Sequence, residues 1–164
     1  TSTKVAATAV NVAFRDSVMG EKSTIDLQKG ATSVTLKNIK DATINYGDSS
    51  TGAITLDASN ANGSEVTTDL TVNAKGGALT GLALTAAGEL KNLTLNATAG
   101  TIAVATAGIS GVNKLDTLVV NATKNVTLDN ITSTNTAAMT KIELNATGGD
   151  IKVSTAGESI TNGG

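Results

Sequence analysis

The stretch from Leu90 to Thr106, LKNLTLNATAGTIAVAT, contains a short Leu-x-Leu strand, an Asn-Ala-Thr corner and a second short apolar run. The pattern returns as LDTLVVNATKNVTLDNI from Leu115 and as MTKIELNATGGDIKVST from Met139, and a weaker version, TDLTVNAKGGALTGLALT, begins at Thr68. The unit recurs about every 24 residues, a period that predicts a solenoid whose units bury their apolar faces only by stacking on one another.

Apolar and polar residues alternate within the unit as they do in a β-strand. Leu93 and Leu95 fall on one face of an extended chain, while Thr94 and Asn96 fall on the other. Each unit then has a second inward-facing pair, Ile102/Val104, Val126/Leu128 and Ile151/Val153. The predicted fold is an all-β, parallel β-solenoid: an elongated rod of about 24-residue coils, spaced about 4.8 Å apart and joined by backbone hydrogen bonds.

The composition agrees with a thin core. The 164 residues include one Phe (Phe14), one Tyr (Tyr46) and no Trp, His, Cys or Pro. Aliphatic side chains stack well in parallel strands, whereas a core that every coil lines in register has little room for rings.

Charge and hydropathy argue against two classes of partner. Twelve basic and 14 acidic residues give a net charge of -2, with no basic block, so nucleic acid is not expected as a partner. No run approaches the roughly 20 apolar residues of a membrane helix. A chain without Cys needs no oxidising folding step, which agrees with an extracellular location. Because it begins at Thr1 and ends in Asn-Gly-Gly, we expect a fragment of a longer protein.

Three segments are expected within one continuous elongated domain. Residues 1–58 are divergent N-terminal coils or a cap, with Phe14 in the core or capping the end. Residues 59–69 form a polar loop, interpreted as a tolerated insertion more than a binding loop, and residues 70–164 form the regular repeats. Glycines are expected at the corners, where they accept positive φ. They are Gly76, Gly77, Gly88, Gly100, Gly108, Gly148, Gly149 and Gly157.

The repeated asparagine has two interpretations. Its side chains could stack into an amide ladder between coils. Its outward phase instead favours plain solvent-facing or corner asparagines, which is the interpretation we prefer. Asparagine also opens N-x-Ser/Thr glycosylation sequons at Asn62, Asn92, Asn96, Asn121, Asn125, Asn130 and Asn145.

The sequence contains no recognisable catalytic or cofactor-binding constellation. There is no His or Cys, no paired carboxylate site and no phosphate-binding Gly-rich motif, so we expect a protein that is not an enzyme. The candidates for a metal are Asp129 and Asp150, at coil corners where backbone oxygens could help to bind Ca²⁺. Solvated corner aspartates are the preferred interpretation, and no metal ligand set is assigned.

The Leu-x-x-Leu-x-Leu openings, as at Leu90, Leu93 and Leu95, are similar to leucine-rich repeats, but the second half of each unit is β and Gly-rich. We interpret the similarity as convergence on an inward-facing strand. An ice-binding solenoid needs a flat array of Thr-x-Thr pairs. Matching outward positions here carry Thr94, Val119 and Glu143, which argues against such an array.

The units NLTLNATAGTIAVATAG, KLDTLVVNATKNVTLDNITSTN and KIELNATGGDIKVSTAG resemble the repetitive β-solenoid regions of bacterial surface-layer proteins of the type I-secreted, RTX-associated kind. The resemblance covers about Thr68 to Ser159. It implies self-assembly into a two-dimensional lattice on the cell surface, often with Ca²⁺, and attachment to cell-surface polysaccharide through another part of the parent protein. The segment DLTVNAKGGALTGLALTAAGEL also resembles haemagglutinin-type adhesin passengers, so a secreted β-helical stalk is the alternative.

Overall fold

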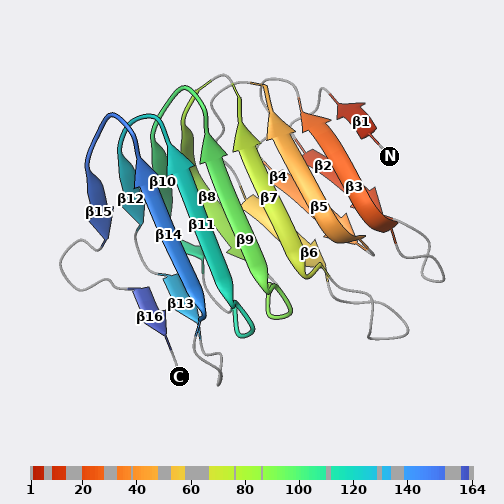
Figure 1. Ribbon diagram of the computed structural model, residues 1–164. Coiled ribbons are helices and arrows are strands. Elements are labelled where there is room, and N and C mark those ends of the chain that lie inside the picture. The colour runs from red at the N-terminus through yellow and green to blue at the C-terminus, as the bar shows by residue number, and fades with distance from the viewer. Residues whose placement is uncertain are drawn as a thin grey trace.

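The computed structural model describes most of the chain as strands of a parallel β-solenoid (Figure 1). The described residues are 2–5, 9–13, 20–27, 33–37, 39–47, 53–57, 67–75, 77–85, 87–109, 112–128, 131–133, 139–153 and 160–162. Within these ranges no residue is helical. The predicted fold class is therefore confirmed.

Each coil contributes one strand to each of two facing sheets. The seven-stranded sheet contains, in order, β1 (Ser2–Val5), β3 (Gly20–Leu27), β5 (Ile39–Tyr46), β7 (Asp69–Ala74), β9 (Asn92–Ala97), β11 (Thr117–Ala122) and β14 (Lys141–Ala146). The nine-stranded sheet contains β2 (Ala9–Ala13), β4 (Ser33–Lys37), β6 (Ala53–Asp57), β8 (Leu79–Thr85), β10 (Ile102–Ile109), β12 (Val126–Leu128) and β15 (Ile151–Val153), with β13 (Ile131–Ser133) beside β10 and β16 (Ile160–Asn162) beside β13. Neighbouring strands are parallel, as stacked coils require.

The coil length is regular in the later part of the chain and variable before it. Equivalent asparagines are separated by 23, 25 and 24 residues from Asn73 to Asn145. The two preceding steps, from Asp26 to Asn45 and from Asn45 to Asn73, are 19 and 28 residues. The strands β1 to β6 nevertheless pair into the same two sheets, so the early coils differ in their connections and not in their architecture.

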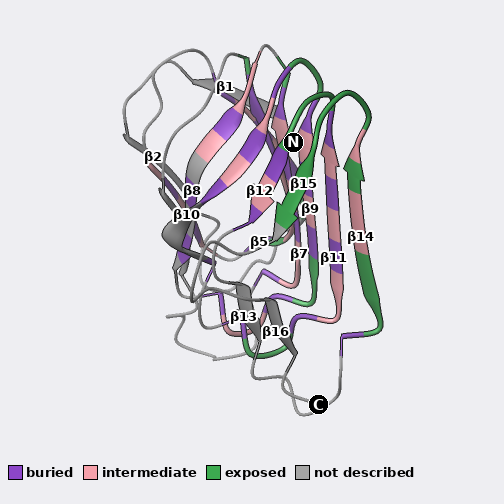
Figure 2. Cartoon of the chain, turned by 90° about the vertical axis from the view of Figure 1, so that its left-hand side faces the viewer, coloured by how far each residue is buried: buried purple, intermediate pink, exposed green. Residues whose placement is uncertain are grey.

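The core is a continuous column of mostly aliphatic side chains between the sheets. Figure 2 shows buried and partly buried residues alternating along strands such as β11. The predicted phase is confirmed, because Leu93, Leu95 and Ala97 are buried while Thr94 and Asn96 are partly exposed. The second-strand residues Ile102, Val104, Val126 and Leu128 are buried as predicted. Register pairs Val72, Leu95, Val120 and Leu144 directly across four strands, so each coil continues the column of the last.

Turns before the strands of the seven-stranded sheet also contribute to the core. Leu90 and Leu115 are fully buried, and their backbone N–H groups donate to the carbonyls of Ala87 and Val112. The Leu-x-x-Leu-x-Leu openings thus combine a buried turn residue with an inward-facing strand, in agreement with the convergence interpretation. Tyr46 is 3% exposed at the end of β5. Phe14 lies outside the described residues.

The glycine corners need a different explanation from the one predicted. Gly100 is buried, and a Cβ there would lie 2.7 Å from the Ala78 nitrogen in the adjacent coil. A Cβ on Gly149 would lie 2.8 Å from the Asn125 nitrogen. Neither residue adopts a positive φ, so the close approach of the neighbouring coil, and not backbone conformation, requires glycine at both positions.

Two further predicted corners differ from one another. Gly88 lies in a turn, as predicted. Gly108 does not form a corner, because it lies inside β10. The pairing of β10 with β8 shifts register between Val104 and Ile109, so β10 has extra residues relative to β8 within the strand at this place. Gly76 and Gly157 lie outside the described residues.

The segment expected to be a polar loop leads directly into β7. Residues 58–66 lie outside the described part of the chain, but Thr67 is buried, and its hydroxyl donates to the Ile39 carbonyl at 2.7 Å. Asp69 is already the first residue of β7. The end of this segment is therefore fastened to the preceding coil.

Candidate functional site

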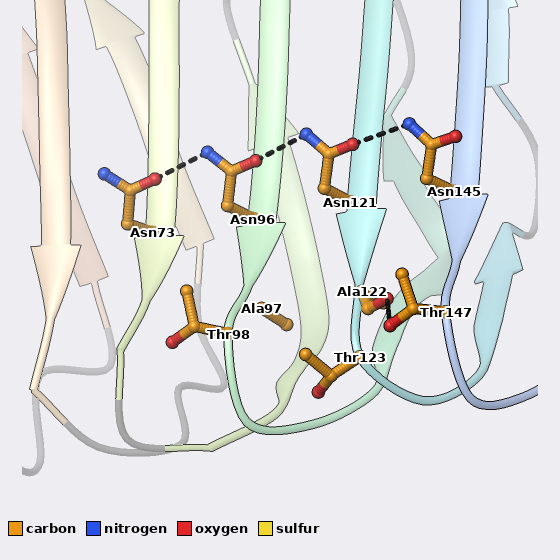
Figure 3. Close-up of a pocket in the computed structure, with 9 residues that line it drawn as sticks. All are labelled: Asn73, Asn96, Ala97, Thr98, Asn121, Ala122, Thr123, Asn145 and Thr147. Atoms are coloured by element: carbon orange, nitrogen blue, oxygen red, sulfur yellow. Dashed lines mark hydrogen bonds between the residues drawn. The ribbon is translucent and has the colours of Figure 1, made fainter.

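A ladder of asparagine side chains crosses the outer face of the seven-stranded sheet (Figure 3). The amide nitrogen Nδ2 of each asparagine donates to the side-chain oxygen Oδ1 of the residue one coil earlier. The bonds are Asn73 to Asn45 at 2.8 Å, Asn96 to Asn73 at 2.7 Å, Asn121 to Asn96 at 2.8 Å and Asn145 to Asn121 at 2.8 Å. All the bonds run in one direction along the rod, so the amide dipoles are aligned and polarise one another.

This ladder corrects the preferred interpretation of the repeated asparagine. The outward phase is confirmed, since Asn73, Asn96 and Asn121 are partly exposed. The conclusion that they are separate solvated side chains is wrong. In-register parallel strands place identical side chains at hydrogen-bonding distance on either face of the sheet, so a ladder does not require burial.

The two ends of the ladder differ chemically. At the N-terminal end the carboxylate of Asp26 accepts from Asn45 at 2.7 Å, so the run of donors ends on an anion. At the C-terminal end Asn145 also donates to Glu143 at 2.9 Å. Lys141 Nζ lies 2.7 Å from Glu143 Oε2, and the hydrogen bonds from Lys141 and Asn145 lower the pKa of the Glu143 carboxyl.

A shallow groove of about 520 Å³ runs beside the ladder. The asparagines form one side of the groove, and the corner threonines with the neighbouring alanines form the other, as Figure 3 shows. The lining residues are Asn73, Asn96, Asn121, Asn145, Thr98, Thr123, Thr147, Ala97 and Ala122. The groove is thus the Asn-Ala-Thr triplet of the repeat, stacked coil upon coil. The sequence showed this triplet but not that its members line one continuous surface.

The corner threonines are fixed by backbone bonds to the preceding coil. The Thr98 hydroxyl donates to the Lys75 carbonyl at 3.0 Å, and the Thr123 hydroxyl donates to the Gly100 carbonyl at 3.5 Å. The backbone N–H of Thr123 donates to the Ala97 carbonyl at 3.2 Å. Sheet-like hydrogen bonding therefore continues past the end of the strand into the corner.

A column of threonines lies next to the ladder on the same face. Register aligns Thr24, Thr43, Thr71 and Thr94, and the column continues with Val119 and Glu143. The alignment of Thr94, Val119 and Glu143 agrees with the prediction. The three earlier threonines, Thr24, Thr43 and Thr71, were missed because only the later coils were compared. The adjacent column consists of asparagines and not of threonines, so a Thr-x-Thr array does not form at these positions.

The structure places the described sequon residues in three settings. Asn96, Asn121 and Asn145 belong to the ladder, and Asn92 donates to Asp69 at 2.6 Å. Asn125 is exposed and accepts the backbone N–H of Asp150 through its side-chain oxygen. Asn62 and Asn130 lie outside the described residues. Glycosylation of these sequons stays a prediction.

The calcium candidates are not brought together. Asp129 lies outside the described residues. Asp150 is exposed, and its backbone oxygen accepts from the Val126 N–H at 2.9 Å. In the described ranges no group of three or more acidic, His or Cys side chains is close enough to hold a metal ion. A Ca²⁺ requirement therefore remains a prediction without an assigned site.

Comparisons with known proteins give no family for this chain. No protein-family model matches it, and neither a curated protein nor a solved structure is significantly similar to it. Among the described residues no helix is long and apolar enough to span a membrane.

Proposed function

We propose that the chain is a structural segment of a bacterial surface layer, in which copies of the parent protein associate into a two-dimensional lattice outside the cell. The observation that carries the proposal is the repetition on the outer face of the seven-stranded sheet. A threonine column and the asparagine ladder lie side by side across successive coils. The coils that carry β5, β7 and β9 thus offer the same threonine and asparagine side chains at the same place, and the asparagines continue through β11 and β14.

A repeating face of this kind suits many weak contacts between copies. A lattice needs contacts that recur by symmetry, and a surface that repeats along the rod supplies several equivalent ones. Ion pairs between coils, such as Lys22 with Asp41 at 3.4 Å and Lys114 with Glu89 at 2.5 Å, place opposite charges side by side, which weakens the local electrostatic field that a neighbouring copy would meet. Both features favour lateral association over electrostatic repulsion.

The proposal gives the chain a mechanical role and no catalytic one. The aliphatic column between two parallel sheets makes each coil depend on its neighbours, which supports a stiff rod. Calcium, if the lattice requires it, would act between copies or at corners and not in the apolar core. Removing calcium should then dissociate the lattice without unfolding the rod.

Electron microscopy of the parent protein tests the proposal, on cells and after reassembly in vitro with and without Ca²⁺. We expect an ordered array that a chelator disperses. The circular dichroism spectrum of the 164-residue chain should stay that of a β-protein in the same chelator. Single fibres projecting from the cell, with no ordered array in any condition, would contradict the proposal and favour the adhesin stalk.

A further inference from the structure

The groove beside the asparagine ladder is lined by small or amide side chains that carry no charge. Its lining contains Asn, Thr and Ala only, and it spans the coils that carry Asn73, Asn96, Asn121 and Asn145. Lys75 occupies, one coil earlier, the corner position that Thr98 and Thr123 occupy in the later coils. Its side chain is not part of the groove lining. The groove therefore offers hydrogen bonds without selecting for either sign of charge.

The ladder leaves regular hydrogen-bonding capacity for a ligand. A primary amide has two N–H donors and an oxygen with two lone pairs. Asn96 uses one N–H toward Asn73 and one lone pair toward Asn121, and Asn121 uses the same two groups toward Asn96 and Asn145. One N–H and one lone pair remain on each of these amides, repeated at the coil spacing of about 4.8 Å.

The opposite side of the groove adds acceptors. The hydroxyls of Thr98 and Thr123 donate to backbone carbonyls of the preceding coil. Their oxygens keep lone pairs for an incoming donor. Since the ladder and the backbone bonds already hold these side chains in place, a ligand orders little on binding, which reduces the entropic cost of association.

The direction of the groove excludes the usual modes of peptide docking. The groove crosses the strands, whereas a peptide that joins a sheet must lie parallel to them at an open edge. An amphipathic helix inserts large apolar side chains into a hydrophobic groove, whereas this groove is shallow and the only apolar residues in its lining are alanines. A nucleic acid or acidic polymer needs cationic side chains, and the lining has none.

We infer that this groove binds a linear, uncharged polysaccharide laid along the rod axis. Sugar hydroxyls both donate and accept, which matches the free N–H and lone pair on each amide and the acceptor on each threonine. The chain of sugars repeats its hydroxyls along its length as the coils repeat theirs. This inference goes beyond the lattice proposal, because it assigns glycan contact to the rod itself and does not depend on assembly.

The structure also sets the expected strength of binding. The lining contains no aromatic ring for a sugar to stack on, so each sugar contributes only a few exposed hydrogen bonds. Affinity must then come from several coils acting together, and it should increase with the length of the oligosaccharide.

The test is a titration of the 164-residue chain with three neutral β-1,4-linked hexasaccharides, of glucose, mannose and xylose, and with the matching disaccharides. NMR of the asparagine side-chain amides reports binding at the groove. We expect at least one hexasaccharide to shift the Asn96 and Asn121 amide signals saturably, with affinity at least about tenfold above its disaccharide.

Matched variants locate the site. Thr123→Val removes a hydroxyl from the groove, and Thr94→Val removes one from the same sheet outside the groove. Both positions are solvent-accessible, so both variants should fold. We expect weaker binding in Thr123→Val alone. Equal binding by the two variants, no saturable shift with any of the hexasaccharides, or stronger shifts with a Ser-Gly repeat peptide would overturn the inference.

Discussion

Strands β11 and β14 have similar sequences, TLVVNA and KIELNA, but different surroundings. Leu118 of β11 is 0% exposed, and Ile142, which pairs with it in register, is 45% exposed. The second strands of the two coils differ in the same way, with Val126 at 0% and Ile151 at 45%. The apolar positions are equivalent in the repeat and unequal in burial.

The difference shows that a residue's place in the stack decides its burial. Among the described strands β11 pairs with both β9 and β14, whereas β14 pairs only with β11. In a coil with a neighbour on each side, the aliphatic side chains are covered from both directions along the stack. In a coil with one neighbour, they are covered from one direction only. The same substitution should therefore have different effects in the two coils, and the predictions below test this.

The largest effect is expected in the middle of the stack. Leu95→Asp places a carboxylate without a partner in the aliphatic column and removes a buried side chain, which should cost on the order of 4 kcal/mol or more. Thr94→Asp changes the next residue, which points outward, and should cost under about 1 kcal/mol. Urea unfolding followed by circular dichroism measures both.

Similar losses in the two variants would contradict the strand phase itself. The unfolding slope must stay the same in all variants for the comparison to report on stability alone. If Leu95→Asp does not fold, Leu95→Ala replaces it, with an expected cost of about 2–5 kcal/mol.

The second prediction compares the two coils directly. Leu118→Ala should cost about 2–5 kcal/mol, because the coils on both sides enclose this position and the shortened side chain leaves a cavity between them. Ile142→Ala should cost roughly 1 kcal/mol, since about half of that side chain is already in water. The same urea titration is suitable, and a cost at Ile142 equal to that at Leu118 would show that the last described coil is covered.

The fold could be predicted from the sequence because one alternation of apolar and polar residues builds the core in every regular coil. Each unit repeats the same alternation, so the inward phase of Leu95 and Val120 and their register follow from the repeat. The early coils were harder to recognise because steps of 19 and 28 residues hide the period while the strands still pair. The role of Gly100 could not be foreseen, since it depends on how closely Ala78 of the preceding coil approaches.

The candidate site was less predictable for a related reason. The Asn-Ala-Thr triplet was visible, but a ladder and a groove are properties of several stacked triplets. Burial was taken as the condition for stacking of Asn96, whereas register alone brings it within 2.7 Å of Asn73. A search for identical polar residues at matching outward positions would have found both the ladder and the threonine column.

The third prediction uses the ladder to compare the coils. Asn96→Ala removes one bond to each neighbouring coil and should cost about 1 kcal/mol, a modest sum for two partly exposed bonds. Asn145→Ala removes one bond to a neighbouring coil and one to Glu143 on its own strand, both exposed, and should cost roughly 0.5 kcal/mol. Thermal unfolding of both variants measures the difference, and a larger loss at Asn145 would contradict the dependence on neighbours.

The smallest effect is expected at the C-terminal end of the ladder. Glu143 of β14 occupies there the position that Val119 holds in β11, the strand with neighbours on both sides. Hydrogen bonds from Lys141 and Asn145 lower the pKa of Glu143 below its ordinary value of 4.5 in the folded chain. A depressed pKa contributes stability that is fully present above the unfolded value and is lost as the pH falls through the folded value. The group is exposed, so solvent screens the contribution and it should be small.

An NMR titration of the Glu143 carboxyl should give a midpoint below 4.5 that moves upward in Lys141→Met. Glu143→Gln should remove this small loss of stability at acid pH. A midpoint at or above 4.5, or one unmoved in Lys141→Met, would show that solvent and not the ladder end sets the charge of Glu143.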